Sequence, residues 1–464
     1  MPTTEVFKSI TKHHYLIQDI HDVVRVLDEA FYVANTGRKG PVLVDLPKDI
    51  QVGSAVPQFN PPMRLPGYHP TIPAVQDDEI QEIVEALMNA KQPVMMVGGG
   101  VIASEATDEV RQLARRLQIP VCSTVMGLGA VPSDEPLFME MVGMHGSVCA
   151  NMAVNECDVL LVLGCRFSDR VSGRLSEFAR KAKIIHIDLD RSELHKIVRN
   201  ALCIEGDVKA TIQAILKKLP AEAEGSAIWK EKTQQWMRDF PLDYNRNSPH
   251  ILPQEAISEL SRQAKPYSPY VTTGVGQHQM WAAQFFKLDR PRQFMTSGGA
   301  GTMGFGLPVA MGAQAAHPQD MVLCIEGDGS VLMNIQEMAT CYCEHLPVKM
   351  MILNNQHLGM VMQWEDRFFK GNRGNTYLGP IENPETLGRG DGFSPVHRYP
   401  DFVQIAKGFG WQGRSIINKE DLTPAIAEML AADGPYMLDV AIPYQEHVLP
   451  MIPAGCGVKD LIRK

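Results

Sequence analysis

Two polar motifs in the second half of the chain each follow an apolar run of strand length. Gly327-Asp328-Gly329-Ser330 follows residues 321–326, and Asn354-Asn355 follows residues 348–353. Between the motifs, apolar side chains recur at helical spacing, at Leu332, Ile335, Met338, Ala339 and Tyr342. A strand, a crossover helix and a second strand predict two parallel strands. The two motifs should therefore meet at the carboxyl edge of one sheet, where open α/β sheets bind ligands.

The residue types at this edge suit a hard cation. The Asp328 carboxylate, the Asn355 amide and the backbone carbonyl of His357 are oxygen donors, and Mg²⁺ completes its octahedron with water and phosphate oxygens. The flanking glycines let the backbone approach a phosphate, and a helix predicted to start near Ser330 offers free N–H groups. The motif pair resembles the thiamine diphosphate motif. A chance Gly-Asp-Gly turn and a calcium loop are the weaker interpretations, the latter because the acidic residues that it needs at alternating positions are missing.

Composition indicates a water-soluble α/β protein of two or three domains. The chain has 464 residues, 45% hydrophobic and 21% charged, with a net charge of −9 that argues against nucleic acid as the main partner. No apolar run reaches about 18 residues, so no membrane span is expected. The nine cysteines include no CxxC pair, which is typical of free thiols in a reducing compartment.

The alternation of apolar runs predicts doubly wound parallel sheets in several parts of the chain. Residues 1–56 contain one helix over 20–35 and one strand over 41–46, too little for a layered core. Residues 57–73 carry six prolines and read as an extended linker. The expected domains are a partial domain at 1–56, a central domain at 74–220, a linker at 221–250, a third domain at 251–445 and a tail at 446–464.

Strands of the central domain are predicted at 93–97, 121, 158–163 and 183–187, with one helix expected between the first strand and Leu117, and the strand ends carry glycines, arginines and aspartates. Polar residues along one sheet edge favour a nucleotide-type ligand, while a plain doubly wound domain with polar loops fits equally well. In the third domain a strand at 270–273 runs into a glycine-containing stretch at 274–278, and a second glycine-rich stretch follows at 298–306. Its dinucleotide fingerprint is interpreted as fortuitous because no clear strand precedes it. Residues 369–400 lack an apolar period and are expected to form a lid or a disordered loop.

Seven motifs resemble the catalytic subunit of the acetohydroxyacid synthase (acetolactate synthase) family. They are GPVLVDLPKDI (40–50), GMHG (143–146), GCRFSDRVSG (164–173), GVGQHQMWAAQ (274–284), TSGGAGTMGFGLP (296–308), the GDGS and NN pair, and EHVLPMIPAG (446–455). The resemblance implies an α/β thiamine-diphosphate enzyme with pyrimidine-binding, FAD-associated and diphosphate-binding domains. It implies decarboxylation of pyruvate and transfer of the hydroxyethyl unit to a second 2-keto acid, pyruvate or 2-ketobutyrate, in branched-chain amino acid biosynthesis.

The resemblance also implies roles for individual residues. Asp328, Asn355 and the His357 carbonyl would hold Mg²⁺, and Gly327, Gly329, Ser330 and Gly304 would contact thiamine diphosphate. Met303 would support the bent cofactor, Gln277 and His278 would lie near the diphosphate, Arg170 would meet the substrate carboxylate and Trp364 would shape the acceptor pocket. Lys48 would line the channel mouth. A structural FAD would contact Arg38, Gly98, Gly99, Met144, His145, Asp188 and Asp207.

The front of the chain departs from the family pattern. The family's activating glutamate has no counterpart in residues 1–50, so a truncated chain that is inactive alone, or active only when extended upstream, is one expectation. A flavin-dependent pyruvate oxidase of the same architecture is the alternative enzyme. The expected partners are 2-keto acids and a second copy of the chain in a dimer or tetramer, with a regulatory small subunit left open. The expected location is the bacterial cytoplasm, with a plastid as the alternative.

Overall fold

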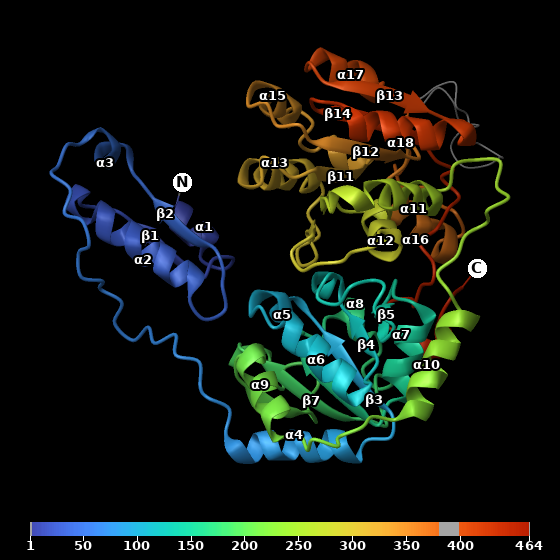
Figure 1. Cartoon of the computed structure of the whole chain (residues 1–464). Coiled ribbons are helices and arrows are strands. Elements are labelled where there is room, and N and C mark those ends of the chain that lie inside the picture. The colour runs from blue at the N-terminus through green and yellow to red at the C-terminus, as the bar shows by residue number, and fades with distance from the viewer. Residues whose placement is uncertain (1, 380–398, 464) are drawn as a thin grey trace.

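The computed structural model describes residues 2–379 and 399–463 and consists of three α/β units joined in chain order (Figure 1). A small amino-terminal unit, drawn in blue, is connected to the central unit by a long extended segment and contacts it through Arg38. The expected lid at 369–400 falls largely on residues 380–398, outside the described residues. No helix in the described ranges has the length and apolar character needed to cross a membrane.

The amino-terminal unit is a two-stranded parallel sheet covered by one long helix. The predicted helix and strand are confirmed as α2 and β2, but the sequence prediction missed β1, which pairs with β2 from His13↔Val42 to Leu16↔Asp45. The elements are α1 (Thr3–Phe7), β1 (His13–Leu16), η1 (Ile20–Asp22), α2 (Val23–Asn35), β2 (Val42–Asp45) and α3 (Lys48–Val52). The core of this unit is small and centres on Ile17, Val26 and Ile50.

The central unit is a six-stranded parallel sheet in the order β5-β4-β3-β6-β7-β8. Its strands are β3 (Pro93–Val97), β4 (Val121–Ser123), β5 (Phe138–Met141), β6 (Val159–Leu163), β7 (Lys183–Asp188) and β8 (Leu202–Glu205). Its helices are α4 (Asp77–Asn89), α5 (Gly99–Ala103), α6 (Thr107–Leu117), η2 (Val125–Gly127), α7 (Val148–Glu156), α8 (Asp169–Ser172), η3 (Arg191–Glu193), α9 (Val208–Lys218) and α10 (Ala227–Asp239). The strand order reverses between β3 and β6, which creates a crevice at their carboxyl ends.

The third unit is also a six-stranded parallel sheet, in the order β10-β9-β11-β12-β14-β13. Its strands are β9 (Tyr270–Thr273), β10 (Phe294–Thr296), β11 (Val322–Gly327), β12 (Lys349–Asn354), β13 (Gln412–Ile416) and β14 (Tyr436–Ala441). Its helices are α11 (Pro253–Ala264), η4 (Lys265–Tyr267), α12 (Gln277–Phe285), α13 (Gly306–Ala316), α14 (Asp328–Val331), α15 (Glu337–Cys343), α16 (Gly359–Phe368), α17 (Phe402–Gly408), η6 (Lys419–Asp421) and α18 (Leu422–Ala431), with η7 (Val458–Asp460) near the end. The strand order reverses between β9 and β11.

Three expectations need correction. A short strand, β10, does precede the second glycine-rich stretch, although helix α13 begins only at Gly306. The single helix expected after β3 is two helices, separated near Glu105, which has a φ of 55°. The helix expected near Ser330 is the four-residue α14, which already begins at Asp328 and is separated from α15 by a turn.

Helix α10, in the segment that follows the central unit, packs against the sheet of that unit. Trp229 is 2% exposed, its indole N–H donates to the carbonyl of Pro93 at 2.9 Å, and its ring meets Trp236 edge-on. The two tryptophans therefore dock this helix on the central unit. All nine cysteines lie in the described residues and are free thiols, as predicted, with six of them buried.

Candidate active site

One cavity of about 1190 Å³ joins the carboxyl edges of the central and third sheets. It also receives Arg38 and Lys39 from the amino-terminal unit. Both sheets therefore present the loops that follow their strands to the same space, as the strand-order reversals predict. Of the site residues predicted from the sequence, Gly98, Gly304 and Lys48 are not part of the cavity lining, and all the others are.

Asp328 and Asn355 lie together at the ends of β11 and β12, which are paired in parallel. Asp328 Oδ1 accepts the Gly329 N–H at 2.8 Å, whereas its Oδ2 is buried without a hydrogen bond. Burial raises the pKa of Asp328 to about 7. Asn355 Oδ1 accepts the His357 N–H at 3.0 Å, and Asn355 Nδ2 donates to Gln277 Oε1 at 3.2 Å. A buried carboxylate oxygen without a partner, beside an oriented amide oxygen, fits a bound cation.

The cation would rely on mixed oxygen donors. Among the described residues no three His, Cys, Asp or Glu side chains come together as a metal cluster. One carboxylate, one amide and backbone carbonyls leave several coordination positions for water or phosphate, as Mg²⁺ prefers. A side chain at position 329 would bring its Cβ within 2.6 Å of the Leu358 side chain, and the Met303 methyl lies 3.7 Å from that same position. Met303 therefore faces the glycine at which a phosphate would approach.

Glu326 is a buried acid next to the cavity-lining His278, and the sequence analysis missed it. It is fully buried at the end of β11, and its Oε2 lies 3.6 Å from Nε2 of His278. Burial raises the pKa of Glu326 to about 7, opposed by the Ser330 hydroxyl and the backbone N–H of Gly327. A charged residue closing an otherwise apolar strand directly before Gly-Asp-Gly was the available signal.

Two buried histidines should make the free energy of unfolding depend on pH. Burial lowers the pKa of His278 to about 3 and that of His145 to about 4. Because the unfolded chain titrates near pH 6.5, it binds more protons than the folded chain between these values. The free energy of unfolding should fall by about 1.4 kcal/mol per pH unit for each histidine as pH drops from 6.5 toward 4.

Urea denaturation from pH 4.5 to 7.5 measures the total slope, to which Asp328 and Glu326 contribute with the opposite sign because their pKa values are raised. The comparison of variants therefore isolates the share of one histidine. His145→Gln should remove its share of the slope, and His345→Gln, at an exposed position, is the matched control. An unchanged slope in a folded His145→Gln variant would contradict the assignment.

In the central half of the cavity, the backbones after β3 and β6 approach each other closely. Gly98 N donates to Leu163 O at 2.9 Å, and Gly100 N donates to Gly164 O at 3.1 Å. A Cβ on Gly98 would lie 2.2 Å from the carbonyl oxygen of Gly164. The glycines predicted to face a nucleotide thus also permit this contact between chain segments.

Asp188 and Asp207, the two acidic residues predicted to contact FAD, also accept hydrogen bonds from the protein backbone. Asp188 Oδ1 accepts the Asp190 N–H at 2.9 Å, and burial raises the pKa of Asp188. Asp207 caps helix α9 by accepting the Ala210 N–H at 2.9 Å. Each carboxylate lines the cavity as well, so one oxygen of each is left for a ligand hydroxyl.

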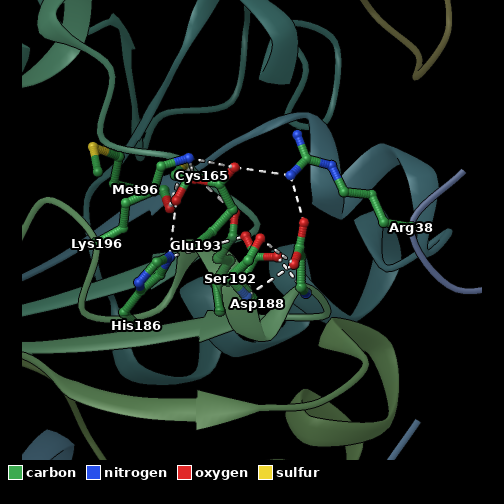
Figure 2. Close-up of polar contacts among 10 residues, drawn as sticks. Arg38, Met96, Cys165, His186, Asp188, Ser192, Glu193 and Lys196 are labelled. Atoms are coloured by element: carbon green, nitrogen blue, oxygen red, sulfur yellow. Dashed lines mark hydrogen bonds and ion pairs between the residues drawn. The ribbon is translucent and has the colours of Figure 1, made fainter. Parts of the chain in front are cut away.

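Arg38 crosses from the amino-terminal unit to the central unit (Figure 2). Its Nη1 donates to Asp190 Oδ2 at 2.6 Å and to Glu193 Oε1 at 2.8 Å. Glu193 is 7% exposed and also pairs with Lys196 at 3.2 Å. These ion pairs, which the sequence analysis did not foresee, hold Arg38 at the rim of the cavity.

Arg170 and Trp364 are the two predicted substrate contacts. The Arg170 guanidinium is largely exposed, and its Nη1 lies 3.4 Å from Oδ2 of Asp169, which is also exposed. Trp364, on α16, is half-buried against Phe368, with ring centroids 4.9 Å apart. Both residues line the cavity, and Arg170 retains donors that can bind a carboxylate.

Comparison with known families matches the two large units separately. Residues 80–215 match the central domain of thiamine pyrophosphate enzymes, and residues 274–440 match their C-terminal TPP binding domain. The parallel sheets and the site at the ends of β11 and β12 thus define a thiamine-diphosphate enzyme.

The same comparison identifies close relatives among plant proteins. The chain is 48% identical to acetolactate synthase 1, chloroplastic, of Zea mays over 99% of this chain and 71% of that protein. It is 49% identical to acetolactate synthase 1, chloroplastic, of Oryza sativa subsp. japonica (99% and 70%) and 46% identical to acetolactate synthase, chloroplastic, of Arabidopsis thaliana (99% and 68%). The chain belongs to the acetolactate synthase family. These relatives do not favour the oxidase alternative, and their names do not support a bacterial cytoplasm.

Proposed function

We propose that the chain catalyses acetolactate synthesis, the decarboxylation of pyruvate and transfer of the two-carbon unit to a second 2-keto acid. The observation that carries this proposal is the buried, unpaired Asp328 oxygen beside the Asn355 amide at the carboxyl ends of β11 and β12. Family membership supports the choice of reaction, because the relatives carry the name of this synthase.

The chain would hold the cofactor through its diphosphate. Asp328, Asn355 and the His357 carbonyl would bind Mg²⁺, and the glycines at 327 and 329 leave room for phosphate oxygens. Gln277 would keep Asn355 oriented through its 3.2 Å hydrogen bond. Thiamine diphosphate supplies the nucleophilic carbon and the electron sink of the reaction.

The remaining residues would act on the substrates. Arg170 would bind the keto-acid carboxylate by a charge-assisted pair of hydrogen bonds. Trp364 would limit the size of the second keto acid, and Met303 would support the cofactor. His278 would donate or accept a hydrogen bond in its neutral form, because burial keeps its pKa near 3.

We further propose that the central half of the cavity holds FAD in a structural role. Gly99, Gly100, His145, Asp188 and Asp207 line that half, and Arg38 lies at its rim, contributed by the amino-terminal unit. Self-association with active sites shared between copies, a regulatory small subunit, and location in a plastid complete the proposal.

Cofactor binding and turnover test the proposal. Purified chain is dialysed against thiamine diphosphate, Mg²⁺ and FAD, and bound cofactor is quantified. 2-Acetolactate formed from pyruvate is then measured with this chain and with a form extended upstream to the relatives' length. Binding of both cofactors and acetolactate formation by either form are expected. Absence of both, or reduction of bound flavin by pyruvate at the rate of turnover, would contradict the assignment.

A further inference from the structure

Glu365 is a buried acid on α16 that no step of the proposed reaction uses. It is 7% exposed, and both of its side-chain oxygens are taken by one short stretch of chain. Oε1 accepts the Gly374 N–H at 2.7 Å, and Oε2 accepts the Thr376 hydroxyl at 2.8 Å. Arg373 Nη1 lies 3.6 Å from the same Oε2. We call this stretch, residues 373–378, the return segment.

The return segment pairs with the turn that carries the predicted metal ligands. Leu358 N donates to Thr376 O at 2.7 Å, and Leu378 N donates to Gln356 O at 2.9 Å. His357 and Tyr377 thereby form an antiparallel bridge, with their rings 5.3 Å apart. The segment from 356 to 358 is thus held from one side by main-chain hydrogen bonds.

That turn has a backbone conformation that needs support. Gln356 has a φ of 58°, in the left-handed region that is unfavourable for a residue with a side chain. It lies between Asn355 and His357, so it sets the direction in which the Asn355 amide and the His357 carbonyl point. Such a conformation persists only when surrounding contacts determine it.

We propose that Glu365 is a positioning residue for the metal site. By binding Gly374 and Thr376, it fixes the return segment, and the return segment fixes the 355–357 turn in the geometry that presents its oxygens to a cation. The proposal rests on the proposed function, since it concerns the Mg²⁺ site of that function. In this role Glu365 does not touch the cation; it orients the residues that bind the cation.

Mn²⁺ binding in the presence of thiamine diphosphate tests the proposal, with free Mn²⁺ measured by electron paramagnetic resonance. Glu365→Ala should weaken Mn²⁺ binding roughly 10- to 100-fold. Thr376→Val, which removes one of the two hydrogen bonds, should weaken it less. The double variant Glu365→Ala/Thr376→Val should bind Mn²⁺ as tightly as Glu365→Ala alone, because both substitutions act through the same contact. Glu344→Gln, an exposed acid at the end of α15, is the charge-matched control and should leave the affinity unchanged.

The outcomes separate the two proposals. Failure of the unsubstituted chain to bind Mn²⁺ would overturn the proposed function and this inference together. Normal Mn²⁺ affinity in folded Glu365→Ala, with circular dichroism and thermal midpoint close to those of the parent chain, would overturn this inference alone. If Glu365→Ala does not fold, Thr376→Val decides, and unchanged affinity in that variant counts against the proposal.

Discussion

Asp328→Asn should weaken the binding of Mg²⁺ and thiamine diphosphate by at least about 100-fold and reduce acetolactate formation accordingly. The substitution keeps the size of the side chain and the oxygen that accepts the Gly329 N–H, but it removes the only carboxylate among the proposed ligands. A neutral amide attracts a divalent cation far less strongly in a buried site. Equilibrium dialysis of thiamine diphosphate at several Mg²⁺ concentrations measures the effect.

Asp320→Asn provides the control for Asp328→Asn. Asp320 is an exposed acid before β11 that pairs only loosely with His317, at 3.6 Å. Its loss changes the net charge by the same amount and should leave cofactor affinity intact. Equal affinities in the parent chain and in Asp328→Asn would show that the cation, if it binds, binds elsewhere.

Gly164→Ala should destabilise the central unit by roughly 2–4 kcal/mol. Gly164 has a φ of 57°, and an added Cβ would lie 2.5 Å from Cα of Gly100. The strained backbone and the overlap with a second backbone act together, because neither segment can move without breaking the hydrogen bond from Gly100 N. Urea denaturation and FAD binding should both report the loss.

Gly312→Ala is the matched glycine control. Gly312 lies on the exposed side of helix α13, and an added Cβ there would have no neighbour within 4 Å. Alanine should stabilise this helix by about 0.5–1 kcal/mol. Similar effects of the two substitutions would contradict the steric reading of the Gly164 contact.

Long apolar runs that end in glycine were predictable, and short edge strands were not. The strands at 93–97 and 270–273 have the predicted bounds. The first is apolar along its whole length, as is typical of a buried parallel strand, and the second is a run of aromatic and β-branched residues. The edge strands β5, β8, β10 and β13 escaped prediction, as did the interior strand β14, in which Asp439 interrupts the apolar run. The four edge strands have three to five residues and carry polar or charged side chains, so no run of apolar residues marks them.

The meeting of Asp328 and Asn355 was predictable for a topological reason. A right-handed crossover brings the ends of consecutive parallel strands together whatever the details of the connecting helix. The roles of Glu326 and Glu365 were not predictable in this way. Glu365 matters because the chain turns back after α16, and Arg38 meets Glu193 from 155 residues away. Such contacts depend on how complete units pack, which no local pattern records.

The extended segment between α3 and α4 gives the Arg38 ion pairs a significance beyond their individual strength. This proline-rich segment tethers the amino-terminal unit to the central unit, so the guanidinium experiences a higher effective concentration of its carboxylate partners than it would on a separate chain. Reassociation after each separation is then fast, and weak polar contacts suffice to keep the small unit docked. Added salt screens partly exposed ion pairs, so ionic strength would tune how long this unit stays docked at the cavity rim.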